Sequence, residues 1–191
     1  MTDDEKYMRM ALGEAEKAMA RGEVPVGCVI VCEGQVVGRG HNLTETLQDV
    51  TAHAEIQAIT AGAQTLGGKY LQGCTLYVTV EPCVMCAGAI GWAQVSRVVY
   101  GAADEKRGFS TFAPKALHAK CQVEAGVLEA ECRELMQAFF RNKRPLRVQH
   151  PRRQNKSSAN ATDLLNCSGL PLPPPQHSCV GDPKCSKNKA K

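Results

Sequence analysis

The sequence lacks the segments that would carry a chain into or across a membrane. No apolar run reaches the roughly 18–20 residues that span a bilayer. The chain opens on Met-Thr-Asp-Asp-Glu-Lys, which is charged and unlike the apolar core of a secretory signal. No internal repeat is visible along the chain. These absences indicate a globular protein of the cytoplasm, with no membrane partner.

Ten cysteines are present, yet a disulfide framework is not expected. Cys28, Cys32 and Cys74 lie inside apolar, strand-like runs, where a reduced thiol behaves as a small hydrophobic group. With no secretory signal, the cysteine content therefore fits a reducing cytosol better than an oxidising compartment.

The charge is unevenly distributed along the 191 residues. Residues 1–144 hold 15 Lys and Arg against 17 Asp and Glu, whereas residues 145–191 hold 8 against 2 and seven of the ten prolines. We therefore expect one folded domain over 1–144 and a basic, proline-rich, disordered tail over 145–191. A second interpretation is that the tail attracts RNA phosphates non-specifically.

Apolar periodicity divides residues 1–144 into alternating helices and strands. The predicted helices extend to about residue 20 and cover 52–64, 83–94 and 128–144, with Asp3 or Asp4 capping the first and Thr51 the second. The predicted strands cover 24–32, 35–40, 75–80, 95–100 and 122–127, with a loop over 42–50. Because strand–helix–strand units give parallel neighbours and the hairpin is antiparallel, we expect an α/β fold with a mixed five-stranded sheet between helices.

The most specific pattern in the chain combines His53-Ala-Glu55 with Pro82-Cys83-Val-Met-Cys86. One imidazole and two thiolates are three zinc ligands, which leaves a fourth position open, as in catalytic zinc sites. A structural site would normally close with four protein ligands. Cys83 and Cys86 are three apart at a predicted helix start, so both sulfurs face one way. The pattern predicts one zinc ion per subunit, held by His53, Cys83 and Cys86.

Glu55 is the predicted acid–base residue of this site. Zinc lowers the pKa of a bound water from about 16 to about 7, which provides a nucleophile at neutral pH. A carboxylate two residues from the histidine can take a proton from that water and deliver it to a ring nitrogen and then to a departing amine. This role requires Glu55 to stay off the metal.

Four segments together resemble the bacterial tRNA-specific adenosine deaminases. They are Glu23-Val-Pro-Val-Gly27, Thr51-Ala-His-Ala-Glu55, Leu76-Tyr-Val-Thr-Val-Glu-Pro-Cys-Val-Met-Cys-Ala-Gly-Ala-Ile90 and Val98-Val-Tyr-Gly101. The resemblance implies a three-layer α/β/α cytidine-deaminase-like fold, a zinc-dependent deaminase domain over 1–144 and a homodimer. It also implies hydrolysis of adenosine to inosine at the wobble position (34) of a tRNA anticodon, here that of an arginine tRNA with the anticodon ACG.

The resemblance also assigns roles to individual residues. It gives the zinc ligands as His53, Cys83 and Cys86 and the proton shuttle as Glu55. The residues that it implies for substrate binding are Asn42, which would contact the base, and Asp104, Lys106, Arg107, Phe140 and Arg141, which would contact flanking nucleotides and the anticodon loop. The chain departs from the family at Phe109-Ser-Thr-Phe-Ala-Pro114, which is bulkier than the small residues common there.

Two other functions share parts of this pattern. The same metal chemistry would serve a deaminase of a free base or nucleotide, such as guanine, cytosine or deoxycytidylate. A zinc-bearing RNA-binding subunit without catalysis would keep the ligands, but retention of Glu55 argues against it.

Overall fold

The computed structural model describes residues 1–143, and the predicted tail over 145–191 lies outside these residues. The helices are α1 (Asp3–Ala20), α2 (Thr44–Leu47), α3 (Ala54–Leu66), α4 (Val84–Trp92), α5 (Phe109–Phe112) and α6 (Glu129–Lys143). The strands are β1 (Gly27–Cys32), β2 (Gln35–His41), β3 (Cys74–Val80), β4 (Arg97–Ala102) and β5 (Gln122–Ala125). Within the described part of the chain, none of the helices is both long and apolar enough to cross a bilayer.

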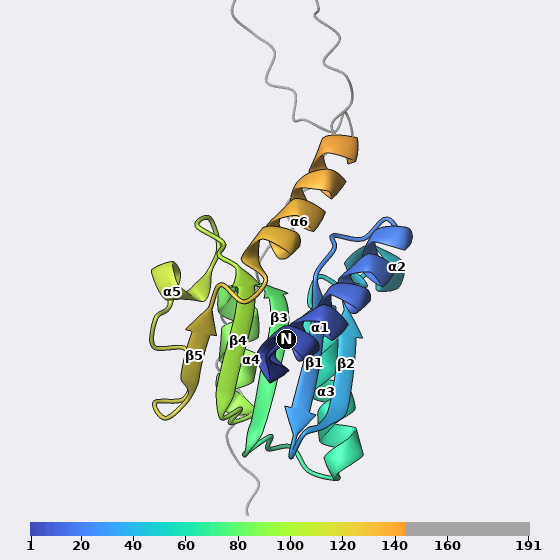
Figure 1. Ribbon diagram of the computed structural model, residues 1–191. Coiled ribbons are helices and arrows are strands. Elements are labelled where there is room, and N and C mark those ends of the chain that lie inside the picture. Colours follow the sequence, from blue (N-terminus) through green and yellow to red (C-terminus); the bar gives the residue numbers. More distant parts are fainter. Residues whose placement is uncertain (144–191) are drawn as a thin grey trace, which may run out of the picture. The chain divides into compact units, whose positions relative to one another are not determined.

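The five strands form one mixed sheet, as predicted, and their order across it is β2-β1-β3-β4-β5 (Figure 1). β1 pairs antiparallel with β2 and β3, while β4 is parallel to both β3 and β5. As a result the ends of β2, β3 and β4 and the start of β1 meet at one edge of the sheet. The open edge at the ends of parallel strands is where ligands usually bind in α/β folds.

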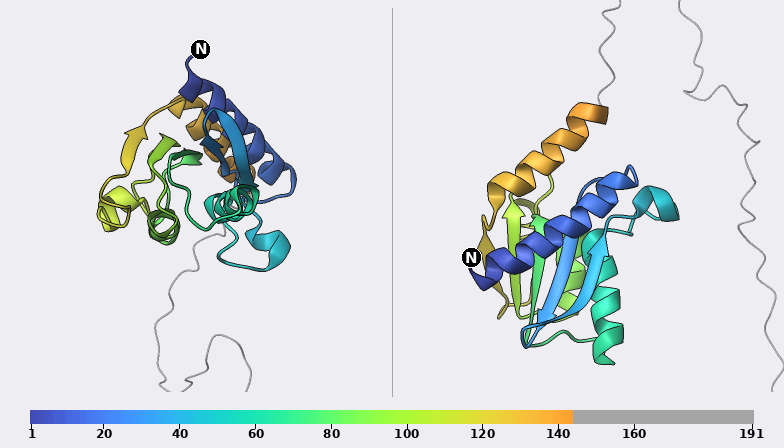
Figure 2. Two further views of the ribbon diagram at one scale, coloured as in Figure 1. Left: turned by 90° about the horizontal axis from the view of Figure 1, so that it is seen from below. Right: turned by 45° about the vertical axis from the view of Figure 1, so that its right-hand side comes forward.

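Helices cover both faces of the sheet, which confirms the three-layer architecture (Figure 2). Because side chains alternate along a strand, β1 sends Val29 and Val31 to one face and Cys28 and Ile30 to the other. The first face packs against α1 and α6, and the second against α3 and α4. Two apolar cores, the larger of them on the α3/α4 face, therefore hold the sheet between its helices.

The N-terminal caps differ from the sequence predictions at two helices. Thr2, not Asp3 or Asp4, caps α1 in a capping box with Glu5, because Asp4 instead forms an ion pair with Arg97. Thr51 does not cap α3, because its backbone N–H and hydroxyl both bond Asp49 Oδ1. α3 consequently begins two residues later than predicted.

Most other elements lie within a few residues of their predicted bounds. The strand predicted at 95–100 is shifted to 97–102, because Val95 N–H donates to Ile90 O, where the chain closes the end of α4. The strand predicted over 24–32 begins only at Gly27. Residues 24–26 do not join the strand, and Pro25 among them has no N–H to donate to a neighbouring strand. The single-turn helices α2 and α5 were not predicted.

Candidate metal centre and adjoining cavity

His53 is the N-cap residue of α3, directly before the first helical residue. α3 packs closely on β2, since a Cβ on Gly38 would lie 2.4 Å from Ala58 O and one on Gly40 would lie 2.3 Å from Ala54 O. Only glycine leaves room for the helix backbone at these two positions. The glycines of β2 therefore fix how the start of α3, and with it His53, stands on the sheet.

Cys83 and Cys86 occupy the start of α4 in the same way. Cys83 is the N-cap of α4, and Cys86 lies within the first turn and is buried. His53 Nδ1 lies 3.7 Å from Cys83 Sγ and 3.4 Å from Cys86 Sγ. The ligand atoms of all three residues fall within 4.8 Å of one another. Two helix N-termini thus bring together the three predicted ligands.

The three side chains fit a tetrahedral zinc ion. With Zn–N of about 2.0–2.1 Å and Zn–S of about 2.3 Å, two ligands at the tetrahedral angle stand roughly 3.5 Å apart. The two measured sulfur–nitrogen distances, 3.7 and 3.4 Å, bracket this value. The His/Cys/Cys donor set is also soft enough to prefer zinc to magnesium or calcium. The chain therefore carries a site for one zinc ion, with three protein ligands.

The thiols of Cys83 and Cys86 have pKa values shifted in opposite directions. A hydrogen bond from Cys86 lowers the pKa of Cys83 to about 4, assisted by His53 and opposed by burial. The same interaction with Cys83, together with burial, raises the pKa of Cys86. The hydrogen bond to Cys83 raises the pKa of His53, against the effect of burial. The lowered pKa favours the thiolate form of Cys83, which is the form that binds a metal.

Glu55 lies in the first turn of α3 and is only 3% exposed. Burial raises the pKa of Glu55, and the interactions with backbone N–H and with His53 only partly oppose it. A raised pKa makes an ionised carboxylate a better proton acceptor, which suits a group that takes up and returns a proton. Glu55 is not part of the His/Cys/Cys group, but it lies two residues after His53 in the first turn of the same helix.

Asn42 follows the end of β2 and is 6% exposed. Its Oδ1 accepts a hydrogen bond from Ala54 N at 3.2 Å, and its own N–H donates to Val26 O. Asn42 therefore ties the end of β2 to the start of α3. With the oxygen used in this way, the amide NH₂ is the group that Asn42 can offer to a base.

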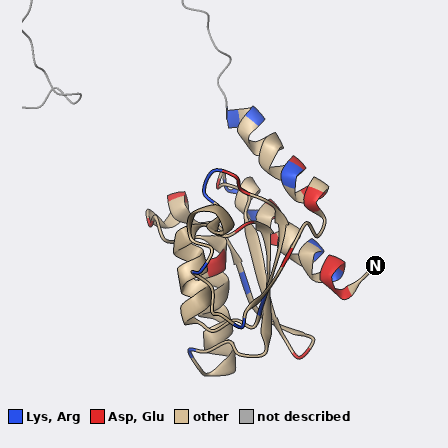
Figure 3. Ribbon diagram, turned by 90° about the vertical axis from the view of Figure 1, so that its left-hand side faces the viewer, with Lys and Arg blue, Asp and Glu red and all other residues tan. Residues whose placement is uncertain are grey.

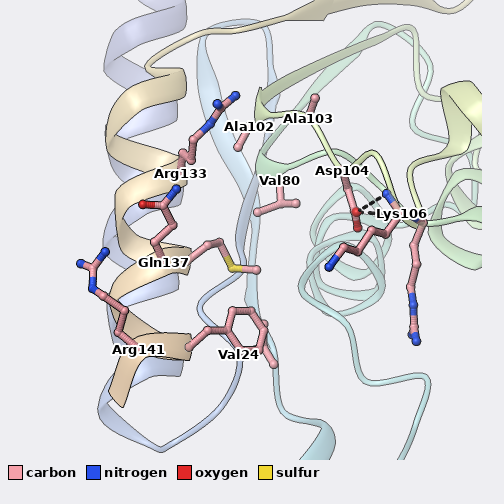
Figure 4. Close-up of a pocket in the computed structure, with 12 residues that line it drawn as sticks. Val24, Val80, Ala102, Ala103, Asp104, Lys106, Arg133, Gln137 and Arg141 are labelled. Atoms are coloured by element: carbon pink, nitrogen blue, oxygen red, sulfur yellow. Dashed lines mark hydrogen bonds between the residues drawn. The ribbon is translucent and has the colours of Figure 1, made fainter. Parts of the chain in front are cut away.

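A cavity of about 870 Å³ opens at the same edge of the sheet, between α6 and the loop after β4 (Figure 4). Five of the six substrate-binding residues implied by the resemblance line it, namely Asp104, Lys106, Arg107, Phe140 and Arg141. The lining also contains Arg133, so that four basic side chains face one acidic side chain. The cavity shares no residue with the metal group, but Glu81 and Pro82 join its wall at Val80 directly to Cys83.

The two phenylalanines of α6 have different environments. Phe140 is 47% exposed at the cavity, whereas Phe139 is 5% exposed and belongs to the packed side of α6. Lys143 lies over the ring of Phe139, at 4.7 Å from its centre. Arg141 and Lys143 make the last turn of α6 basic (Figure 3). In the segment 109–114, where the chain differs from the family pattern, Phe109 is buried and Phe112 is 60% exposed.

Sequence reasoning missed two buried carboxylates that flank the site. Glu23 is fully buried and accepts hydrogen bonds from Thr44 Oγ1 and from the backbone of Glu45 and Thr46. Burial raises the pKa of Glu23, but these bonds outweigh it and hold the pKa below its usual value. Glu81 is 5% exposed and bonds Asp104 N and Ser110 N. Acidic residues inside apolar segments were the available signal for both.

Known proteins match the chain over its described part. The family model for the cytidine and deoxycytidylate deaminase zinc-binding region matches residues 1–102. The tRNA-specific adenosine deaminase of Bacillus subtilis strain 168 is 46% identical over 149 residues, which cover 75% of this chain and 92% of the relative.

Solved structures show the same fold. One comes from a study of A-to-I editing by tRNA:A34 deaminases at the wobble position of transfer RNA. It matches with a TM-score of 0.64 at 44% identity, over 68% of this chain and 98% of that chain. A guanine deaminase from Bacillus subtilis matches with a TM-score of 0.51 at 28% identity, over 80% of this chain and 85% of that chain.

Proposed function

The chain belongs to the tRNA-specific adenosine deaminases, and we propose from this that it hydrolyses adenosine to inosine at position 34, the wobble position, of a tRNA anticodon. The substrate that we propose is the arginine tRNA with the anticodon ACG. The observation that carries the proposal is the basic cavity beside the His/Cys/Cys group, because an enzyme for a free base needs no such surface.

His53, Cys83 and Cys86 would hold the zinc ion, which when bound would lower the pKa of water and so provide a nucleophile at neutral pH. Glu55, buried beside the ligands, takes the proton from the attacking water and passes it to a ring nitrogen of the purine. Glu55 then takes the second proton, from the hydroxyl now bonded to the ring carbon, and delivers it to the amine. The carbon–nitrogen bond breaks as the carbonyl of inosine forms, and the amine leaves as ammonia. The amide NH₂ of Asn42 donates to the purine and holds it in place.

The cavity suits a single-stranded loop of RNA. Bases of an anticodon loop are unstacked, so extracting one costs less than the few kcal/mol needed from a duplex. Lys106, Arg107 and Arg141 line the cavity from two sides and can neutralise phosphates, while the exposed ring of Phe140 can stack on a base. Asp104 contributes through its loop, since its Oδ1 accepts from Lys106 N and Arg107 N.

An exposed apolar surface on α4 supports a homodimer. Trp92 is 85% exposed, Val84 45% and Met85 38%, and Phe112 of α5, which contacts α4, is 60% exposed. Large apolar side chains that gather on the surface indicate a protein interface. A second copy of this chain is the partner that we propose, and the cytoplasm, where tRNA is found, is the compartment.

One assay distinguishes this function from that of a free-base deaminase. Purified protein is incubated with the arginine tRNA, with its anticodon stem-loop and with free nucleosides and bases, and inosine or ammonia is measured. We expect inosine only in the RNA samples. Turnover of a free nucleoside or base with tRNA unchanged would overturn the proposal.

A further inference from the structure

Glu81 holds together the loop that carries Lys106 and Arg107. Its Oε2 accepts from Asp104 N at 3.0 Å, and its Oε1 accepts from Ser110 N at 3.0 Å. The two oxygens of one buried carboxylate thus bind both ends of the segment 104–110, called here the basic loop. Hydrogen bonds to a charged acceptor are about twice as strong as neutral ones.

The space around Gly108 provides a second, independent sign of this attachment. A Cβ at Gly108 would lie 2.4 Å from the Cδ and Oε2 of Glu81 and 2.5 Å from Asp104 O. The backbone φ of Gly108 is −60°, which any residue can adopt. Space, not backbone conformation, therefore requires glycine here, because the basic loop closes directly over the Glu81 carboxylate.

The basic loop is also joined to the metal centre. Phe109 N donates to Pro82 O at 2.9 Å, and Gly108 forms a β-bridge with Cys83. At the other end, Asp104 Oδ1 accepts from Lys106 N and Arg107 N at 3.0 and 3.2 Å. A continuous set of hydrogen bonds therefore runs from a residue next to a metal ligand to the two basic residues.

We propose that Glu81 is a positioning residue, which fixes Lys106 and Arg107 relative to the metal centre and so determines how the nucleotides beside the reacting adenosine are held. The proposal rests on the tRNA deaminase function proposed above. Glu81 itself touches no substrate in this role. If only charge mattered, replacing the acidic Glu81 by a neutral residue would tighten RNA binding. If Glu81 positions Lys106 and Arg107, the same replacement should weaken RNA binding.

The decisive comparison is between Glu81→Gln and Glu105→Gln. Both variants remove one negative charge from the same region, but Glu105 is exposed on the basic loop. A glutamine at position 81 keeps the shape but offers one acceptor oxygen, so its NH₂ would face a backbone N–H. With the anticodon stem-loop as substrate, we expect KM of Glu81→Gln to rise about tenfold, as for loss of one charge-assisted hydrogen bond. Its kcat should stay within about threefold of the wild-type value and its zinc content at one per chain. Glu105→Gln should show an unchanged or lower KM.

Double variants separate positioning from a general structural effect. If Glu81 acts through Arg107, the variant Glu81→Gln/Arg107→Ala should have nearly the KM of Arg107→Ala alone, because contacts already lost cannot be lost again. The salt dependence of KM should also decrease in Glu81→Gln, as for a protein that has lost a phosphate contact. Equal KM values for Glu81→Gln and Glu105→Gln, or fully additive effects with Arg107→Ala, would overturn the proposal.

Gly108→Ala tests the same attachment if Glu81→Gln does not fold. The added methyl group must displace the basic loop from Glu81, so KM should again rise about tenfold with zinc retained. A wild-type KM in this variant would overturn the positioning role. Wild-type protein that leaves the stem-loop unreacted would instead overturn the proposed function, and the positioning role with it.

Discussion

Replacement of Gly40 by alanine is expected to weaken zinc binding more than it weakens the fold. A Cβ at Gly40 would lie 2.3 Å from Ala54 O and 2.6 Å from Ala58 N, both of which are backbone atoms of α3. No side-chain rotation relieves these contacts, so α3 must move about 1 Å from β2 to reach ordinary separation. His53 stands at the start of α3 and moves with it.

The two effects differ in size. Overpacking lowers the free energy of unfolding by about 1–3 kcal/mol. The replacement of glycine by alanine also lowers the conformational entropy of the unfolded state, which raises the free energy of unfolding by about 0.4–1 kcal/mol. The net loss of roughly 1–2 kcal/mol lowers Tm by about 2–8 °C for a domain of this size. Metal–ligand distances tolerate only about ±0.2 Å, so a 1 Å shift of His53 should reduce zinc affinity at least tenfold.

Competition with a chromophoric zinc chelator measures the affinity, and thermal unfolding followed by circular dichroism measures the stability. Gly13→Ala is the matched control, because a Cβ at Gly13 in α1 meets no atom within 4 Å. That variant should gain about 1 kcal/mol from helix propensity and keep its zinc affinity. The reasoning is refuted if Gly40→Ala also becomes more stable and binds zinc as tightly as the wild type.

Three further outcomes are expected. Glu55→Ala should keep zinc and a cooperative unfolding transition but lose inosine formation by at least about 10²-fold, and undiminished turnover would exclude Glu55 as the proton shuttle. The hydrogen bond from Arg97 lowers the pKa of Asp4, whose usual value is 3.8. Its stabilising effect is therefore present above that value and is lost as pH falls through the lowered one. Denaturant titrations should show Asp4→Asn less stable than wild type at pH 7, and the difference should disappear once Asp4 of the wild type is protonated. The Trp92→Glu variant should sediment as a monomer in analytical ultracentrifugation. A variant that remained dimeric would show that the dimer interface does not lie on α4.

The sequence was sufficient for those parts of the site that follow local rules. His53 and Cys83 were predicted close to helix starts from apolar periodicity and from Pro82, and both prove to be N-cap residues. The mixed directions of the strands followed from the alternation of elements and from the hairpin, whereas their order in the sheet was not predicted. These features depend on neighbouring residues in the chain, which a single sequence displays directly.

Contacts between distant segments were not predictable in the same way. Glu81 bonds backbone groups more than twenty residues away, and backbone N–H groups leave no trace in a sequence. The cap of α3 was predicted wrongly because the backbone N–H and the hydroxyl of Thr51 both bond Asp49 Oδ1, so Thr51 does not cap the helix. The helices α2 and α5 are single turns, too short for periodicity to reveal.

The three metal donors all come from one continuous stretch that contains α3, β3 and the first turn of α4. Joining His53 to Cys86 closes a loop of only roughly 30 residues, which carries a modest entropic penalty. During synthesis on the ribosome, the donors emerge before β4, β5 and α6 exist. The order of the chain therefore favours ion capture early in biosynthesis, with the substrate cavity completed afterwards, when α6 docks on the finished sheet.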